Sequence, residues 1–300
     1  MGRPFRRQSE RRQIARPSYG GEREPDSHPT PGPPAFVQPA RVLLPSSEGR
    51  APRSSPGVVR SPGRPALSTG RPVETDDSPA AWVAAALRDD RSVASLVPPV
   101  FEAYARVLHP AVRYAGDDDV DVRWDEVAAY NGTTAHRLMQ WPAITGSWEY
   151  VGEEDQPDVW NDSPAEGHLP AHVAAALGTL LAGWTTTPQE CWFGWCDDDA
   201  ATDRPHLTLP TCDLLLRSGP ITLAAANFAP EPQEQSAAVW WPADRAWFVA
   251  TAPTLMSTYV GGPAGAVDAL LGSLLEAHPA TPDDPVGHET DPVNPIPPRF

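Results

Sequence analysis

The densest group of side chains able to bind a ligand or to react lies in the segment Trp240–Gly262. Pro242 favours a turn that brings the Asp244 carboxylate close to the Arg245 guanidinium, and tryptophan and arginine are enriched in binding hot spots. The candidate binding residues are Trp240, Trp241, Asp244, Arg245, Trp247, Tyr259, Gly261 and Gly262. We expect one strand between two turns, with Tyr259 at the second turn. The segment is either a structural corner, in which Asp244 caps the turn and Arg245 stacks on tryptophan, or a binding edge.

Histidines and cysteines that could bind a metal ion are not spaced as ligands. His168 and His172 are four residues apart, but Pro170 lies between them and no glutamate follows His168 as in zinc proteases. Cys191 and Cys196 are five residues apart, so a strand would point them to opposite faces. We therefore predict that the protein has no metal site.

Motifs for cofactor binding are also missing from the sequence. All 23 basic residues are arginine, which excludes a Schiff-base lysine and a phosphate-binding P-loop lysine. Asp117–Asp121 starts like a calcium loop, but Val122 and Ala128 occupy the positions of its glycine and glutamate. Gly261 and Gly262 precede a helix and form either an anion cradle or a tight turn. The sequence predicts no cofactor.

The charge of the chain is divided between two parts of different composition. Residues 1–78 contain 13 arginines and 8 acidic residues, whereas residues 79–300 contain 10 arginines and 31 acidic residues. All 11 tryptophans follow Ser78. Because the first part has too little apolar surface to offset the entropy of folding, we predict a disordered arm there. A single globular domain is predicted over 79–295, followed by a tail over 296–300.

The composition also restricts the compartment and the class of partner. The sequence shows no apolar segment as long as a membrane span and no signal peptide, and its three cysteines are an odd number. These features favour a reducing cytoplasm. The short apolar runs argue against a membrane as the partner. The acidic domain argues against nucleic acid, and it suits a basic protein whose approach the charge would steer.

Helix signals occur at four places. Ser78-Pro79 predicts a helix start, with serine as the N-cap and proline at the first helical position. A short helix is predicted over Trp124–Tyr130. Between Pro170 and Trp184 apolar residues recur every three or four positions, which predicts the clearest helix. The last helix is predicted to follow a Gly261-Gly262 turn, with Pro263 at its first position.

Strand signals dominate the second half of the chain. Residues 191–196 and 246–252 are apolar on both faces, so we place the second of these segments at the centre of a sheet. Residues 206–210 and 213–217 predict a hairpin, and residues 275–280 predict a last strand. Strands unevenly interleaved with about four helices predict an α+β fold with a mixed or antiparallel sheet.

Three segments give weaker signals. Val100–Leu108 fits a strand slightly better than a helix. Asp117–Asp121 is predicted to be an acidic loop. Leu138–Glu166 is predicted to be irregular, and its tryptophans are expected to cover the core as flaps. These tryptophans are Trp141, Trp148 and Trp160.

Several stretches share a pattern with a larger group of sequences. They are FEAYARVLHPA (101–111), VRWDEVAAYNG (122–132), EGHLPAHVAAAL (166–177), TPQECWF (187–193), WWPADRAWFVAT (240–251), STYVGG (257–262) and Asp291–Asn294. Over residues 80–295 the chain resembles a family of uncharacterised proteins from GC-rich soil bacteria. That family has Pro-Asn where this chain has Ala237-Ala238, and acidic residues where it has Ala252, Thr254 and Met256. The resemblance implies no activity.

The spacing of Trp240, Pro242, Asp244 and Trp247 is also similar to that of bacterial toxin-immunity proteins. Together with the acidic charge, this spacing favours a non-enzymatic cytoplasmic protein-binding module. Such a module would use an acidic, tryptophan-rich face against a basic partner such as a nuclease toxin.

The alternative is an enzyme of unknown class, with His109 or His136 as a base beside Asp244 and Arg245. A deep pocket that gathers a histidine and a carboxylate would favour the enzyme. A shallow groove lined by tryptophan would favour the binding module.

Overall fold

The computed structural model describes residues 78–116, 118–196, 207–209, 213–228 and 234–299. The chain divides into two units: Met1–Pro56 lies outside the described residues, and Gly57–Phe300 contains all of them. The predicted arm, except Ser78, lies outside the described residues, as does Cys212.

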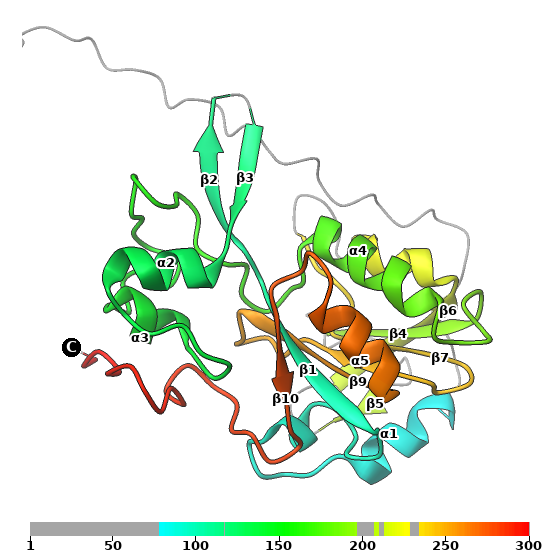
Figure 1. The fold of residues 1–300 in the computed structure, drawn as a ribbon. Coiled ribbons are helices and arrows are strands. Elements are labelled where there is room, and N and C mark those ends of the chain that lie inside the picture. The colour runs from blue at the N-terminus through cyan, green and yellow to red at the C-terminus, as the bar shows by residue number, and fades with distance from the viewer. Residues whose placement is uncertain (1–77, 117, 197–206, 210–212, 229–233, 300) are drawn as a thin grey trace, which may run out of the picture. The chain divides into compact units, whose positions relative to one another are not determined.

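An eight-stranded antiparallel sheet organises the described part of the chain (Figure 1). Its strand order is β10-β1-β9-β8-β7-β4-β6-β5. The strands are β1 (Ala103–Leu108), β4 (Cys191–Cys196), β5 (Leu207–Thr208), β6 (Asp213–Gly219), β7 (Val239–Pro242), β8 (Phe248–Ala250), β9 (Ser257–Gly262) and β10 (Ala277–Ala280). A separate hairpin pairs β2 (Ala111–Ala115) with β3 (Asp118–Val122). The predicted α+β class with an antiparallel sheet is confirmed, and β8 is central.

Five α-helices accompany the sheet in the described residues. They are α1 (Ala81–Ala86), α2 (Trp124–Asn131), α3 (Trp141–Thr145), α4 (Ala171–Ala182) and α5 (Ala264–Leu271), with 3-10 turns η1 (Ser78–Ala80), η2 (Val93–Ser95) and η3 (Ile221–Ala225). The four predicted helices are present, and α3 lies within the stretch that was predicted to be irregular. The predicted start of the first helix is wrong: Ser78–Ala80 form a 3-10 turn, and Ala80 is the N-cap of α1. Pro263 is the N-cap of α5 rather than its first residue.

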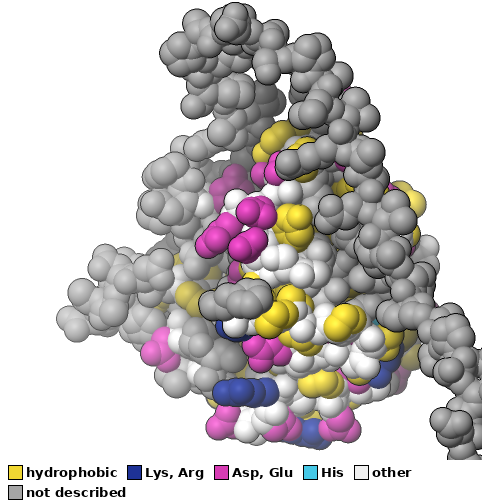
Figure 2. Space-filling view, turned by 90° about the vertical axis from the view of Figure 1, so that its left-hand side faces the viewer, with side chains coloured by type: hydrophobic (Ala, Val, Ile, Leu, Met, Phe, Trp, Pro, Cys, Tyr) yellow, Lys and Arg dark blue, Asp and Glu magenta, His cyan; other side chains and the backbone are white. Residues whose placement is uncertain are grey.

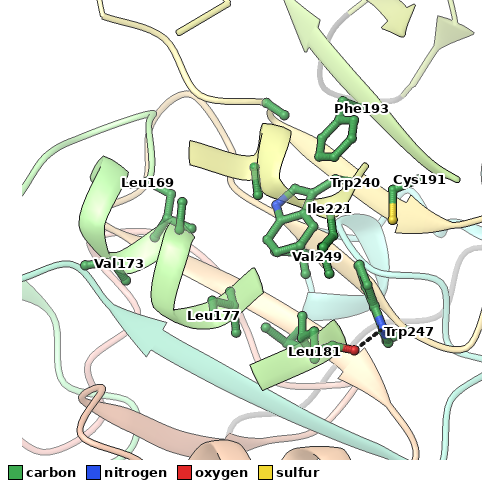
Figure 3. Packing of buried hydrophobic residues seen from close by; sticks show 14 of the residues in the cluster. Leu169, Val173, Leu177, Leu181, Cys191, Phe193, Ile221, Trp240, Trp247 and Val249 are labelled. Atoms are coloured by element: carbon green, nitrogen blue, oxygen red, sulfur yellow. Dashed lines mark hydrogen bonds between the residues drawn. The ribbon is translucent and has the colours of Figure 1, made fainter. Parts of the chain in front are cut away.

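Both faces of the sheet are buried. On one face α4, α5 and η3 pack on strand residues such as Phe193 and Val249 (Figure 3). On the other face η1, α1 and η2 pack on Tyr104 and Phe248. Cys191 belongs to the first core and Cys196 packs against the second, as their odd spacing predicted.

A third core lies at the Leu108 end of β1, where α2, α3 and the β2–β3 hairpin meet (Figure 1). Trp124, Trp141 and Trp160 are fully buried in it. The ring centroids of Trp124 and Trp141 are 5.3 Å apart, and those of Trp141 and Trp160 are 5.2 Å apart. The prediction that Trp141 and Trp160 cover the core as flaps is therefore wrong. Three large rings close together bury enough apolar area to form a core of their own.

The buried Arg106 of β1 connects this third core to the sheet. Its guanidinium donates to the Met139 carbonyl at 2.8 Å and to Gln140 Oε1 at 3.1 Å, and its Nε donates to Ser257 Oγ at 3.0 Å. Its Cζ lies 5.5 Å from the centroid of the Trp124 ring. Because each of these donors has an acceptor, the charge is stabilised where water is excluded.

Two local predictions are wrong for reasons of pairing and packing. The acidic loop expected at Asp117–Asp121 is mostly strand β3, because pairing with β2 outweighs the low strand propensity of aspartate. Gly261 and Gly262 lie in strand β9 and form no turn. A Cβ on Gly261 would lie 2.6 Å from Phe101 Cδ2, so close packing explains the glycine.

The C-terminal segment after β10 is fastened to the third core by Asp291. Its Oδ1 accepts hydrogen bonds from His136 Nε2 at 2.9 Å and from the Asn294 amide at 2.8 Å. Its Oδ2 accepts one from the Gln140 amide at 3.1 Å. Earlier in the same segment, Asp284 accepts hydrogen bonds on both carboxylate oxygens from the Arg137 guanidinium. A segment without regular secondary structure is thus held by buried carboxylates.

We expect these two carboxylates to make the fold sensitive to acid. Burial raises the pKa of both, but hydrogen bonds outweigh it, chiefly from Arg137 at Asp284 and from Asn294 at Asp291, and hold each pKa below 3.8. Depressed folded-state pKa values stabilise the native state above the unfolded pKa, and this stability is lost as pH falls through the folded values. The urea concentration at the denaturation midpoint should therefore decrease when the pH is lowered below about 4.

The measurement is urea denaturation between neutral pH and about pH 3. Arg137→Met, which removes the ion pair of Asp284, should show a shallower loss in the same range. A midpoint that stays constant down to about pH 3 would contradict this prediction.

Candidate functional site

The aromatic members of the sequence-predicted site lie in the interior. Trp240, Trp241 and Trp247 are at most 2% exposed, and Tyr259 is 3% exposed. Trp240 and Trp247 belong to the core under α4 and α5, whereas Trp241 and Tyr259 belong to the opposite core. The expected tryptophan-rich binding face is therefore not formed, because strands buried on both faces direct alternate tryptophans into two cores. Tyr259 lies in β9, not at a turn.

Asp244 and Arg245 are exposed, and they lie in the turn between β7 and β8 as predicted. Asp244 accepts hydrogen bonds from Thr185 Oγ1 at 2.8 Å, from the Thr186 amide at 2.7 Å and from the Ala246 amide at 3.2 Å. Burial raises the pKa of Asp244, but these hydrogen bonds outweigh it and keep the pKa below the usual value. The carboxylate is thus fully engaged in joining this turn to the segment after α4.

Arg245 contacts an aromatic ring rather than a carboxylate. Its Cζ lies 5.2 Å from the centroid of the Trp82 ring, and its backbone is left-handed with φ of 56°. A cation above a ring contributes about 0.5–1 kcal/mol at an exposed site. Together with the bonds of Asp244, this contact supports the interpretation of the turn as a structural corner.

The two candidate histidine bases do not meet Asp244 and Arg245. His109 follows the Leu108 end of β1, which pairs with Ser257 of β9, whereas the Asp244–Arg245 turn precedes Phe248, which pairs with Gly261. Ser257 and Gly261 are four positions apart along β9, which separates these ends by about 13 Å along the strand, and β9 lies between β1 and β8. His136 is bonded to Asp291 in the C-terminal segment. The proposed His/Asp/Arg site is therefore not assembled.

An acidic hollow lies beside the β2–β3 hairpin, and sequence reasoning missed it. Its lining residues are Gly152, Glu153, Glu154, Asp155, Asn161, Asp162 and Ser163, and its volume is about 380 Å³. The hairpin holds one wall, because the Val112 amide donates to the Asp162 carbonyl at 2.9 Å and the Tyr114 amide donates to Asn161 Oδ1 at 2.9 Å. Figure 2 shows acidic and hydrophobic side chains next to one another on the side of the molecule that carries α2 and α3.

Tyr114 reports the negative potential of this acidic hollow. A hydrogen bond to Asp162, followed by burial and the charges of Asp119 and Asp155, raises the pKa of Tyr114 to about 12. The Tyr114 side chain is nevertheless 52% exposed. An exposed tyrosine beside a group of carboxylates is typical of a contact surface. The only sequence signal was the excess of acidic residues in Gly152–Ser163, which contains five and no arginine.

The described residues form neither a metal-binding cluster nor a membrane-spanning helix. Among them, no three histidine, cysteine, aspartate or glutamate side chains are grouped to hold a metal ion. His172 Nε2 instead donates to Asp121 Oδ2 at 2.8 Å. Within the same residues, every helix is too short or too polar to cross a bilayer.

Comparisons of this chain with protein-family models, with curated proteins and with solved structures found no significant match to any of them.

Proposed function

We propose that this protein is a non-enzymatic cytoplasmic binding module whose acidic hollow receives a basic partner protein. The observation that carries the proposal is the concentration of exposed carboxylates around a concave surface. A role of the toxin-immunity type, with a basic nuclease as the partner, fits this chemistry. Cys191 is a buried free thiol, which supports a reducing compartment.

The charge distribution supports recognition of a cationic surface. Glu153, Glu154, Asp155 and Asp162 line the hollow, and none of them forms an ion pair with an arginine that the structure describes. Charges arranged in this way raise the association rate of a basic partner and repel acidic ones. Arginine side chains of the partner could form paired hydrogen bonds with these carboxylates.

The hairpin supplies the apolar part of the contact. Tyr114 is exposed beside the hollow, on the hairpin face that it shares with its strand partner Asp119. Tyrosine at the edge of a polar cavity provides a large contact area with few rotatable bonds. A basic segment lying in the acidic hollow would therefore find both charge and apolar contact there.

Charge reversal should separate this site from the general acidity of the chain. We expect the triple variant Glu153→Arg, Glu154→Arg and Asp155→Arg to bind an oligo-arginine peptide at least about tenfold more weakly than the native chain, and native binding to weaken with added salt. Fluorescence anisotropy of a labelled peptide measures both effects.

The matched control has the same change in net charge elsewhere. Glu190, Asp213 and Asp268 are exposed, and replacing all three by arginine leaves the acidic hollow unchanged. This control should retain at least about half of the native affinity for the oligo-arginine peptide. Equal weakening in both triple variants would show that binding follows net charge alone, and the proposal would then fail.

A further inference from the structure

A groove separate from the acidic hollow is formed by three segments far apart in the sequence. Its lining residues are Asp89, Arg91, Ser95, Leu96, Ala252, Thr254, Leu255, Val286 and Gly287, and its volume is about 320 Å³. The segments follow α1, connect β8 to β9, and belong to the C-terminal chain. A groove of this size is suited to a small molecule rather than to a protein surface.

The charged residues that line this groove, Asp89 and Arg91, differ in their ion pairing from the charged residues next to them in the sequence. Arg88 is bonded to Asp283 at 2.7 Å, and Asp90 Oδ1 accepts hydrogen bonds from the amide and hydroxyl of Ser92. Asp89 and Arg91, by contrast, form no ion pair with each other or with any other described residue. The two residues that line the groove are thus the two whose charges stay available.

The backbone at Arg91 is held in a costly conformation. Its φ is 56°, in the left-handed region that is unfavourable for a residue with a side chain. The Val286 amide donates to the Arg91 carbonyl at 3.0 Å, and the Val93 amide donates to the Asp284 carbonyl at 2.9 Å, which fixes the segment. Strain maintained by its surroundings concentrates at ligand sites, and here it sets the position of a free guanidinium.

The floor of the groove is apolar and short. Leu96 and Leu255 are each 6% exposed, and Val286 is partly buried beside them. Ser95, Leu96 and Ala252 also line a small cavity of about 10 Å³ beside Thr251, which is room for one water molecule. The apolar part of a ligand must therefore be no longer than a small aliphatic side chain.

Thr251, which lines this small cavity, belongs to a chain of hydrogen bonds. His109 Nδ1 lies 2.6 Å from the Ala165 carbonyl and must donate to it, so in neutral histidine Nε2 accepts from Thr258 Oγ1 at 2.9 Å. Thr258 in turn lies 2.6 Å from Thr251 Oγ1. The Thr251 and Thr258 hydroxyl protons are thus used within this chain of hydrogen bonds, and Arg91 is the one cationic side chain among the residues that line the groove.

We propose that this groove binds a small zwitterion of the α-amino-acid class with an aliphatic side chain. Arg91 takes the carboxylate through paired hydrogen bonds, Asp89 takes the ammonium group, and Leu96, Leu255 and Val286 contact the side chain. Binding at this site does not depend on the function proposed for the acidic hollow.

Calorimetric titration of the full chain tests each contact separately. L-leucine should bind at millimolar concentration or below, whereas N-acetyl-L-leucine, without the ammonium group, and L-leucinamide, without the carboxylate, should each bind at least about tenfold more weakly. The blocked analogues also distinguish a free amino acid from a residue at the end of a peptide, which keeps only one of the two charges.

Two variants assign the charges. Arg91→Gly relieves the left-handed backbone and should keep the native melting temperature, while leucine binding falls at least about tenfold and leucinamide binding does not change. Asp89→Asn should weaken the binding of leucine but leave the binding of N-acetyl-leucine unchanged. Arg88→Ala, beside the groove but not lining it, is the matched control and should bind leucine as the native chain does.

Two results would overturn the proposal. One is a native chain that binds none of leucine, valine and methionine at about 10 mM, a concentration at which even a weak specific site is occupied. The other is an Arg91→Gly variant that folds and binds leucine with unchanged affinity.

Discussion

Replacing Asp291 by alanine is expected to lower the free energy of unfolding by about 3–5 kcal/mol. The Asp291 side chain is fully buried, and its two oxygens accept from His136, Gln140, Val293 and Asn294. Alanine would leave these donors without an acceptor in a region that water does not reach. The C-terminal segment would then separate from the third core.

Urea denaturation at neutral pH measures this loss, and Asp283→Ala is the matched control. Asp283 is in the same segment but 83% exposed, and its bond to Arg88 is a surface ion pair. The control should cost at most about 1 kcal/mol. If the two variants lose similar stability, Asp291 does not fasten the segment in the way the geometry indicates.

Replacing Trp247 by alanine is expected to cost a similar amount, about 3–5 kcal/mol. The Trp247 ring is fully buried, lies 5.2 Å from the Trp240 ring between centroids, and donates from Nε1 to the Leu181 carbonyl at 3.0 Å (Figure 3). The substitution would leave a cavity between the sheet and α4 and would remove the partner of a buried carbonyl.

Arg245→Ala, two residues earlier, is the control for this second prediction. Arg245 is exposed and contacts only the Trp82 ring among the aromatic residues described, so its loss should cost about 1 kcal/mol or less. Melting curves and oligo-arginine binding should be measured on both variants. If the Trp247→Ala variant melts like the native protein but no longer binds oligo-arginine, Trp247 is part of a binding face, as the sequence suggested, and the structural interpretation is wrong.

Local pattern was sufficient to predict the elements of this fold. The spacing of apolar residues in Pro170–Trp184 predicted α4, and the turn residues between 206–210 and 213–217 predicted the β5–β6 pair. The odd spacing of Cys191 and Cys196 placed them on opposite faces. Each of these inferences depends only on the helix or strand period, which is a property of the backbone itself.

Local pattern could not determine which side chains reach solvent. Trp240 and Trp241 gave the same signal as an exposed aromatic edge, because a strand covered on both faces and an exposed apolar strand have the same composition. Only the packing of α4 on one face and α1 on the other shows that both rings are buried. The burial of Trp141 and Trp160 likewise depends on α3 and on the β2–β3 hairpin.

The sequence by itself determined the strand and helix periods, the acidic charge and the absence of lysine chemistry. Only the tertiary structure decided which charged side chains line a groove or a hollow where a ligand can reach them. Asp89 and Arg91 meet Leu255 and Val286 in one groove, and Tyr114 meets Asp162 at the acidic hollow, across separations that no local pattern encodes. The reason is physical: a site depends on distances between side chains on different segments, and those distances are set by how the sheet and its cores pack.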